Sequence, residues 1–291
     1  MLIAYQGVPG AYSEMASRRL FPDGTTLPCE TFEDVFAAVE KKRADCGVVP
    51  VENSLAGSIH QNYDLLVAHK LKIVGETYVR VQHALMALPG TKLSAVQAVR
   101  SHPQALAQCS AFFAEHPRVR QIIWYDTAGA ARSLAEARAA DPASVKGVAA
   151  IASEAAAEIY GLKVLKKRLQ NRALNFTRFL AITRSGARVT VAPLATGAPV
   201  ETKTSLTFIP ARNRAGVLHA ITGVFAAHDV DLTKIESRPD PENAFDYRFH
   251  LDAVTGPADP AFRKIVAALK PLTRDLRVLG SYERARLPLK G

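Results

Sequence analysis

The sequence predicts two domains: an α/β domain of two lobes, followed by a smaller α+β domain. Short apolar runs alternate with helical patterns over the first part of the 291 residues, and this repetition is typical of parallel sheets with helices on both faces. After a stretch rich in proline and glycine, the order becomes strand, helix, strand, strand, helix, strand. That βαββαβ order predicts a ferredoxin-like fold.

The composition is that of an ordinary globular protein, with 48% hydrophobic and 22% charged residues. No apolar run is long enough to span a bilayer, and the N-terminus has no signal-peptide pattern. The three cysteines lack metal-ligand spacing, which indicates reduced thiols in a cytoplasmic protein. The net charge of +10 is spread without a dense basic patch. We therefore expect no nucleic-acid or membrane partner, and a field that attracts small anions.

The first domain is expected over residues 1–183. Its elements are located by a continuous apolar run, by a capping box at Thr31-Phe32-Glu33-Asp34 and by a proline at the first turn of one helix. The expected strands are Leu2–Tyr5, Cys46–Val51, Val96–Arg100, Arg120–Trp124 and Gly147–Ile151. The expected helices are Tyr12–Leu20, Val35–Lys42, Ser58–His69, Pro103–Glu115, Thr127–Ala140 and Ser153–Tyr160.

A long β-rich segment, Leu71–Leu88, divides this domain. Because the βα pattern occurs on both sides of the segment, we predict two lobes with a cleft between them.

The second domain is expected at residues 203–283, after a linker at 184–202 and before a tail at 284–291. The linker is set apart by its prolines and glycines and by its lack of periodicity. The expected elements of this domain are the strand Ser205–Pro210, the helix Gly216–His228, the strands Leu232–Ser237 and Ala244–Ala253, the helix Asp259–Leu269 and the strand Leu276–Tyr282.

A polar cluster, Asn175-Phe176-Thr177-Arg178-Phe179, begins another β-like run just before the linker. Strand alternation places Thr177 and Phe179 on one side and Arg178 on the other. At the end of a strand, a hydroxyl is held rigidly and is still accessible to solvent. Arg178 could hold a carboxylate, but because it faces away from Thr177 we give a structural role equal weight.

Polar residues also follow two predicted strands, where ligands bind in open α/β sheets. Asn53 is a donor for a carboxylate or hydroxyl, and Glu52 is a candidate acid whose pKa would rise in an apolar cleft. Ser101 is expected to cap the helix that starts at Pro103 and to contact an anion there, with Gln108 on the same helix.

Two other residues near strand ends remain ambiguous. His102 is expected to do no more than help cap the helix. Ser13 lies in a glycine-containing turn between a strand and a helix. This turn could contact an anion, or it could serve only as a tight turn and helix cap.

Five motifs resemble, in the same order, those of the prephenate dehydratase family, and the resemblance covers nearly the whole chain. It implies a two-lobed fold like the type II periplasmic binding proteins, followed by an ACT regulatory domain. It also implies that the chain crosses back to the first lobe, so that one lobe comprises residues 1–75 with 165–183 and the other comprises residues 76–164. The motifs are Tyr5-Gln6-Gly7-Val8-Pro9-Gly10-Ala11-Tyr12-Ser13, Val48-Val49-Pro50-Val51-Glu52-Asn53-Ser54 with Gly57, Ser101-His102-Pro103-Gln104 with Gln108, Asn175-Phe176-Thr177-Arg178-Phe179 and Glu236-Ser237-Arg238-Pro239.

The resemblance implies conversion of prephenate to phenylpyruvate in phenylalanine biosynthesis. Loss of carbon dioxide and hydroxide makes the ring aromatic, so we expect no cofactor and no metal, only orientation and a donor at the departing oxygen. The resemblance points to Thr177 as that donor, with Glu52 as the alternative acid. The residues expected to bind substrate are Asn53, Ser101, Gln108, Arg178, Phe179 and Ser13.

In the second domain, the resemblance implies a homodimer or homotetramer inhibited by L-phenylalanine. The family commonly has proline where Ala215 stands, and Val217 and His219 also depart from its pattern, so the affinity and selectivity for the effector stay open. A dimerising domain without a ligand is the alternative. The residues expected to bind the effector are Asn213, Ala215, Gly216, Val217, Leu218, Glu236, Ser237 and Arg238.

Two other functions are compatible with the sequence. Arogenate dehydratase performs the same chemistry on a substrate with an amino group in place of the side-chain keto group. A non-catalytic solute-binding or sensor protein could use the same two-lobed fold, although the Asn-Phe-Thr-Arg-Phe motif favours an enzyme. The sequence does not decide between the two substrates or give the number of subunits.

Overall fold

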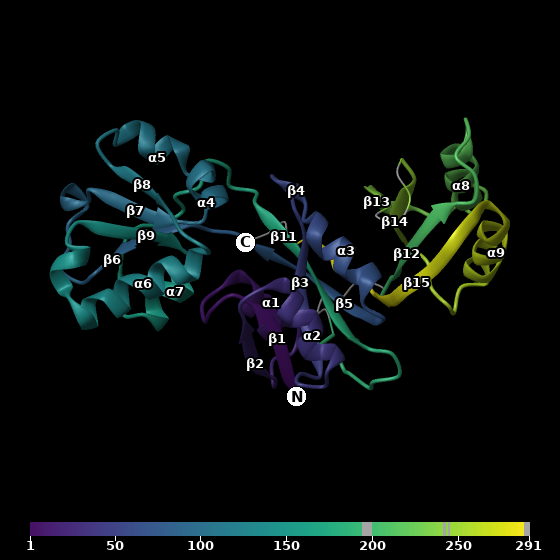
Figure 1. Cartoon of the computed structure of the whole chain (residues 1–291), viewed down its shortest axis with the longest axis horizontal. Coiled ribbons are helices and arrows are strands. Elements are labelled where there is room, and N and C mark those ends of the chain that lie inside the picture. The colour runs from purple at the N-terminus through teal and green to yellow at the C-terminus, as the bar shows by residue number, and fades with distance from the viewer. Residues whose placement is uncertain (194–199, 241–242, 244, 288–291) are drawn as a thin grey trace.

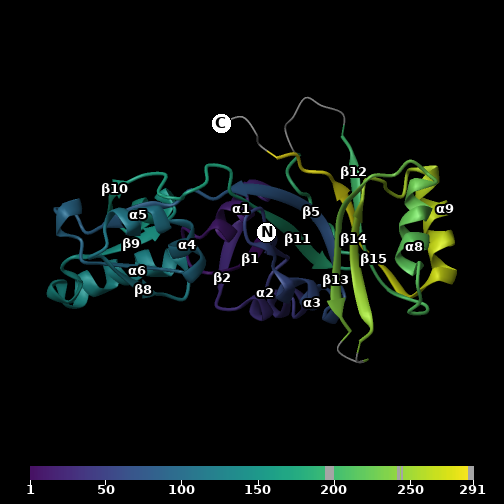
Figure 2. The ribbon, with the colours of Figure 1, turned by 90° about the horizontal axis from the view of Figure 1, so that it is seen from above.

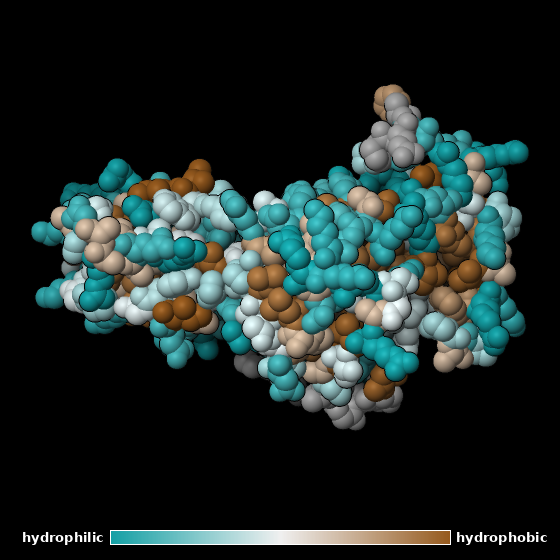
Figure 3. Space-filling view, turned by 60° about the horizontal axis from the view of Figure 1, so that its bottom comes forward, coloured by the Kyte–Doolittle hydropathy of each residue, from teal (hydrophilic) through white to brown (hydrophobic). Residues whose placement is uncertain are grey.

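The computed structural model describes residues 1–193, 200–240, 243 and 245–287. Three β-sheets lie in a row along the long axis of the molecule (Figure 1). Two of them form the lobes of an α/β domain and the third forms a smaller α+β domain, so the predicted fold class is confirmed. The molecule narrows between the two lobes (Figure 3). Among the described residues, no helix is both long and apolar enough to cross a membrane.

Lobe 1 is built on a sheet in the order β2-β1-β3-β11-β5, with β4 paired to β3. The returning strand β11 is antiparallel to both β3 and β5, which places the polar cluster around Thr177 inside this sheet. The strands are β1 (Leu2–Gln6), β2 (Thr25–Cys29), β3 (Cys46–Asn53), β4 (Gly57–Ser58), β5 (Leu71–Arg80) and β11 (Phe176–Arg184). The helices are α1 (Tyr12–Leu20), α2 (Phe32–Glu40) and α3 (His60–Ala68).

Lobe 2 has a sheet in the order β10-β6-β9-β7-β8. Its strands are β6 (Ala84–Ala87), β7 (Ala98–Ser101), β8 (Arg120–Ile123), β9 (Val148–Ala152) and β10 (Lys163–Lys166). Its helices are α4 (Pro103–Gln108), α5 (Ser110–Glu115), α6 (Thr127–Ala140) and α7 (Glu154–Ile159), with 3₁₀ turns at Leu93–Ala95 and Pro142–Val145. The chain crosses between the lobes twice, after β5 and before β11.

Two local predictions can be compared with these elements. The capping box is confirmed, because Thr31 accepts from the backbone N–H of Asp34, whose side chain accepts in return from the Thr31 N–H. The single helix expected at Pro103–Glu115 is wrong. It divides at Cys109, whose φ of −111° and ψ of 23° are not helical.

The second domain has the predicted βαββαβ order and a sheet in the order β13-β14-β12-β15. Its elements are β12 (Thr202–Pro210), α8 (Val217–Ala226), β13 (Leu232–Pro239), β14 (Tyr247–Ala253), α9 (Pro260–Leu269), a 3₁₀ turn (Lys270–Leu272) and β15 (Thr273–Glu283). The strand expected from Ala244 begins at Tyr247, and Ala244 itself lies outside the described residues.

The sheet of the second domain packs directly on lobe 1, while α8 and α9 cover its other face (Figure 2). Leu279 and Tyr282 of β15 belong to the same buried apolar cluster as Ile73 and Leu180 of lobe 1. The approach is close at Gly280, where a Cβ atom would lie 2.0 Å from the carbonyl oxygen of Ile73. Lobe 1 and the second domain therefore share a core.

Candidate active site

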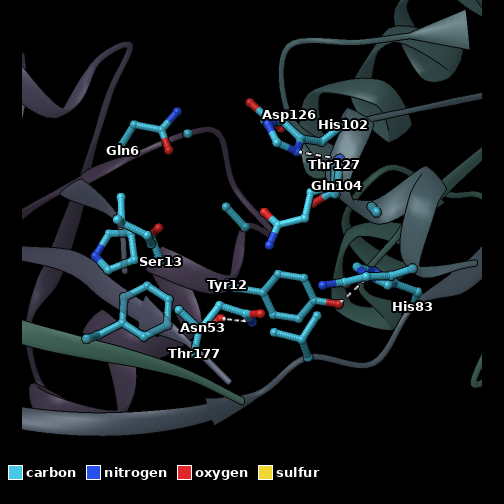
Figure 4. Close-up of a pocket in the computed structure, with 18 of the residues that line it drawn as sticks. Gln6, Tyr12, Ser13, Asn53, His83, His102, Gln104, Asp126, Thr127 and Thr177 are labelled. Carbon is cyan, nitrogen blue, oxygen red and sulfur yellow. Dashed lines mark hydrogen bonds between the residues drawn. The ribbon is translucent and has the colours of Figure 1, made fainter. Parts of the chain in front are cut away.

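A cavity of about 320 Å³ lies between the two lobes and is lined by residues from both. From lobe 1 it receives the ends of β1, β3 and β11 and the start of α1, and from lobe 2 it receives α4 and the start of α6 (Figure 4). Polar side chains that line it are Gln6, Tyr12, Ser13, Asn53, His83, His102, Gln104, Gln108, Asp126, Thr127 and Thr177. Phe179 and several aliphatic side chains form the apolar part of the wall.

The buried Asn53 amide orients the Thr177 hydroxyl. Its Oδ1 accepts from the backbone N–H groups of Leu55 and Ala56, each at 3.0 Å. Since a backbone N–H can only donate, the other end of this amide must be Nδ2. That nitrogen donates to Asn175 Oδ1 at 2.8 Å and to Thr177 Oγ1 at 3.0 Å. Thr177 Oγ1 therefore accepts a hydrogen bond, and its own proton is available to a group in the cavity.

The same hydrogen-bonded chain continues into lobe 2. Asn175 Nδ2 donates to Gln108 Oε1 at 2.9 Å, and His83 Nε2 lies 2.9 Å from the same oxygen. Because Gln108 Oε1 is an acceptor, His83 must carry a proton on Nε2. Burial lowers the pKa of His83, so near neutral pH the ring is uncharged and its Nδ1 is bare.

Aromatic and aliphatic side chains make one side of the cavity apolar. Phe179, Ile59 and Val81 line it together with the ring of Tyr12. The Tyr12 hydroxyl donates to the Gln82 carbonyl at 2.6 Å, and burial raises the pKa of Tyr12. An uncharged phenol and an apolar wall suit a hydrocarbon ring, with the polar groups left to bind its substituents.

Lobe 2 contributes a histidine and a carboxylate. His102 Nδ1 accepts from the backbone N–H of Gln104 at 3.2 Å, and burial lowers the pKa of His102. Asp126 accepts from the backbone N–H of Gly129 and so caps α6. Burial raises the pKa of Asp126 despite that hydrogen bond. Among the described residues that line the cavity there is no lysine or arginine.

The structure brings together five residues that the sequence singles out for chemistry or substrate binding. Thr177, Asn53, Gln108, Phe179 and Ser13 all line the cavity, although they come from four different elements. The sequence places four of them near a strand end or at the start of a helix, and it places Gln108 within the helix that begins at Pro103.

Three other predicted residues lie elsewhere. Ser101 is fully buried and donates to the Ile151 carbonyl at 2.7 Å, and the cap of α4 is His102 rather than Ser101. Glu52 points out of the cavity and forms an ion pair with Lys234 of the second domain, at 3.0 Å. Because strand neighbours alternate, Glu52 and Asn53 leave β3 on opposite faces.

Arg178 also points away from the cavity, as strand alternation predicts. Its side chain is 4% exposed and lies between lobe 1 and the second domain. Nε donates to Glu76 Oε2 at 2.7 Å, Nη1 to Asp252 Oδ2 at 2.5 Å and Nη2 to the Tyr282 hydroxyl at 3.0 Å. Lys203 completes the group through Glu76 Oε1 at 2.7 Å. The structural role of Arg178 is thus visible, and Arg178 is not among the described residues that line the cavity.

Sequence reasoning missed several cavity residues. His83 and Asp126 were not among the predicted site residues, Tyr12 was named only as part of a motif and a helix, and His102 was expected only to cap a helix. Asp126 lies just after the end of β8 and Asn53 is the last residue of β3, so the strand-end rule that singled out Asn53 could also have found Asp126. His83 lies on a crossing between the lobes, and we find no sequence signal that would have singled it out.

The residues expected to bind an effector fall into two groups. Gly216, with a φ of 78°, precedes α8, and Val217 and Leu218 begin that helix. Glu236 and Arg238 project from β13 towards lobe 1, where Glu236 accepts from the Ser58 hydroxyl and Arg238 donates to Asp64 at 2.7 Å. Asn213 and Ser237 are exposed, as is Ala215.

Comparison with known proteins places this architecture in a family. The model of the prephenate dehydratase family matches residues 3–187, and the model of the ACT domain matches residues 206–270. The chain therefore belongs to the prephenate dehydratase family, with an ACT domain after the catalytic region.

Its relatives include enzymes named for two substrates. The chain is 43% identical to arogenate dehydratase/prephenate dehydratase 2, chloroplastic, of Arabidopsis thaliana, over 96% of this chain and 72% of that protein. It is 42% identical to arogenate dehydratase 1 of Petunia hybrida, over 98% of this chain and 68% of that protein.

Solved structures with the same overall fold cover nearly the whole chain. Prephenate dehydratase from Arthrobacter aurescens, in complex with L-Phe, is 30% identical with a TM-score of 0.84, over 98% of this chain and 90% of that chain. The quorum-quenching acylase GqqA is 34% identical with a TM-score of 0.83, over 97% of this chain and 98% of that chain.

Proposed function

We propose that the cavity between the lobes dehydrates and decarboxylates prephenate to phenylpyruvate, with Thr177 as the donor to the departing hydroxyl. The observation that carries this proposal is the hydrogen bond from Asn53 Nδ2 to Thr177 Oγ1. It occupies a lone pair of the threonine oxygen and leaves its proton for the substrate. Glu52, the alternative acid, faces Lys234 instead.

Beyond this hydrogen bond, the reaction requires few groups from the protein. As the bond from the ring to one carboxylate breaks, its electron pair completes the aromatic ring, and the bond between the ring and the hydroxyl breaks at the opposite carbon. Hydroxide departs and takes up a proton to become water. A hydrogen bond from Thr177 stabilises the negative charge that develops on the departing oxygen. Threonine is too weak an acid to surrender its proton outright, so the bond polarises the leaving group.

The other cavity residues would bind and orient the ring. Gln108 has its amide NH₂ available for a carboxylate, because its Oε1 already accepts two hydrogen bonds. Ser13 offers a hydroxyl on the opposite lobe, and Phe179 packs against the apolar ring while excluding water. Holding the ring between two lobes lowers the barrier by orientation as well as by charge stabilisation.

Arogenate is the second candidate substrate. It has an ammonium where prephenate has a keto group, so its net charge is one unit less negative. A cavity with an aspartate and no lysine or arginine among its described lining residues accommodates that charge more easily. Relatives named for both substrates support keeping the two candidates together.

Regulation by L-phenylalanine is proposed for the second domain. It is supported by the ACT match and by the L-Phe complex of the Arthrobacter relative. The proposed effector site is the loop before α8 together with the first turn of that helix, from Asn213 through Leu218. The homo-oligomer and the cytoplasmic location expected from the sequence stay predictions.

The test compares Thr177→Val with Thr177→Ser. Valine keeps the shape and removes the hydroxyl, and loss of one such donor costs about 10²–10³-fold in kcat. Serine keeps the hydroxyl and should retain most activity. Phenylpyruvate is read by its absorbance in alkali, and arogenate turnover by phenylalanine release.

A Thr177→Val variant as fast as the wild type would remove the threonine from the mechanism. A folded wild type that converts neither substrate would favour a binding protein, and acylase activity would then be measured because of the relative GqqA.

A further inference from the structure

The hydrogen bonds that run from Thr177 to His83 have a fixed direction. They begin at the backbone N–H groups of Leu55 and Ala56, which can only donate, and each amide along the way accepts at its oxygen and donates at its nitrogen. The last acceptor is Gln108 Oε1, and its second donor is His83 Nε2. No side chain in this series can turn over without placing two donors or two acceptors against each other.

His83 holds the far end of this series. Its side chain is 2% exposed, and it comes from the crossing between β5 and β6 rather than from the helix that carries Gln108. Without His83, the Gln108 oxygen keeps only the bond from Asn175 and the side chain can swing about it. With both donors, Oε1 is fixed at two points, and the amide NH₂ is held in place at the wall of the cavity that Gln108 lines.

We propose that His83 is a positioning residue, which donates from Nε2 to Gln108 Oε1 and so aims the Gln108 amide NH₂ at a substrate carboxylate. His83 does not transfer a proton and does not touch the substrate. This inference rests on the proposed function of the cavity, because it assigns Gln108 to carboxylate binding.

Two substitutions of similar polarity separate this role from simple packing. In His83→Gln, the amide nitrogen reaches the place of the imidazole Nε2 and can still donate to Gln108. In His83→Asn, the amide is shorter and leaves the Gln108 oxygen with one donor. We expect His83→Gln to keep most of kcat/KM and His83→Asn to lose about tenfold, mainly through KM, since a misaimed carboxylate ligand weakens binding in the ground and transition states alike.

A double variant tests whether His83 acts through Gln108. Gln108→Leu alone should lower kcat/KM by about 10- to 100-fold, because a hydrogen bond to a charged group is lost. Adding His83→Asn to Gln108→Leu should then lower it no further. His116→Asn is the matched control, because His116 also bonds through a ring nitrogen, to the Phe112 carbonyl at 2.9 Å, and does not line the cavity. That control should leave kcat/KM unchanged.

The ring itself gives a readout that does not depend on turnover. In ¹⁵N NMR spectra at neutral pH, His83 should show a protonated Nε2 and a bare Nδ1. Equal activities of His83→Gln and His83→Asn, or losses that multiply in the double variant, would overturn the positioning role while leaving the proposed function intact. An Nδ1-protonated ring would overturn it as well. A wild type that converts neither substrate, with the expected ring protonation, would overturn the proposed function, and the positioning role in catalysis with it.

Discussion

Replacing Arg178 with methionine should weaken the joint between lobe 1 and the second domain. Four buried charged side chains meet there: Arg178 and Lys203 carry positive charge, and Glu76 and Asp252 carry negative charge. Burial alone would raise the pKa of Asp252, but Arg178 and the Ser205 hydroxyl hold it below its usual value. The two positive and two negative charges offset one another only while all four side chains are present.

The magnitude follows from what Arg178→Met leaves behind. Glu76 keeps Lys203 at 2.7 Å and the backbone N–H of Ala285 at 2.9 Å. Asp252, whose side chain is 9% exposed, keeps the Ser205 hydroxyl and loses its direct ion pair with Arg178. Removing one partner of a buried pair costs about 3–5 kcal/mol. We expect the free energy of unfolding to fall by that amount.

The assay is urea unfolding followed by circular dichroism for the wild type, Arg178→Met, Asp252→Asn and the double variant. The double variant removes one charge of each sign and leaves Glu76 with Lys203. Its cost should be less than the sum of the single costs by about 2 kcal/mol. Arg238→Met is the control, because its pair with Asp64 crosses the same joint but is 25% and 53% exposed, and should cost less than about 1 kcal/mol. Additive costs, or a cost of Arg178→Met no larger than this control, would refute the reasoning.

Two further predictions concern acid stability and the lobe contact. Burial and the neighbouring Arg248 lower the pKa of His250 from 6.5 to about 4, so its contribution is complete above pH 6.5 and is lost as the pH falls towards 4. The free energy of unfolding should fall by about 3 kcal/mol from this cause. Urea unfolding at pH 7 and pH 4.5 should show this fall in the wild type and not in His250→Phe. At Gly10 an added Cβ would lie 2.8 Å from the Ala156 Cα of lobe 2, whereas at Gly57, which also has a positive φ, it would meet nothing within 4 Å. Gly10→Ala should therefore destabilise by about 1–3 kcal/mol more than Gly57→Ala, and equal melting temperatures would show that the lobes do not meet tightly there.

Strand alternation and strand ends predicted much of the site. Alternation placed Thr177 and Phe179 on one face of their strand and Arg178 on the other, and the strand-end rule placed Asn53 at the carboxyl edge of a sheet. Both rules follow from backbone geometry alone. The same alternation turns Glu52 away once Asn53 faces the cavity, so the two could not both serve the cleft from a regular strand.

What the sequence could not supply depends on contacts between distant segments. Lys234, the partner of Glu52, is 182 residues away in another domain. Nothing in the local sequence pattern predicts this ion pair. His83 becomes part of the site only because the crossing between lobes passes Gln108. The break at Cys109 is likewise invisible, since both halves of Pro103–Glu115 have helical patterns.

The position of β3 and β11 constrains how the protein can move. Each strand presents one residue to the cavity and its neighbour to the second domain: Asn53 beside Glu52, and Thr177 beside Arg178. Lobe 1 and the second domain share an apolar core and a buried charge group, so separating them exposes both. The two lobes are joined by two crossings of the chain, and beside the cavity they also share a buried apolar cluster, in which Tyr5 and Ala11 of lobe 1 pack with Ala156 of lobe 2. A rotation of lobe 2 against lobe 1 around a substrate would therefore have to rearrange this cluster. A displacement of the second domain against lobe 1 would instead pull on the strands that carry Asn53 and Thr177.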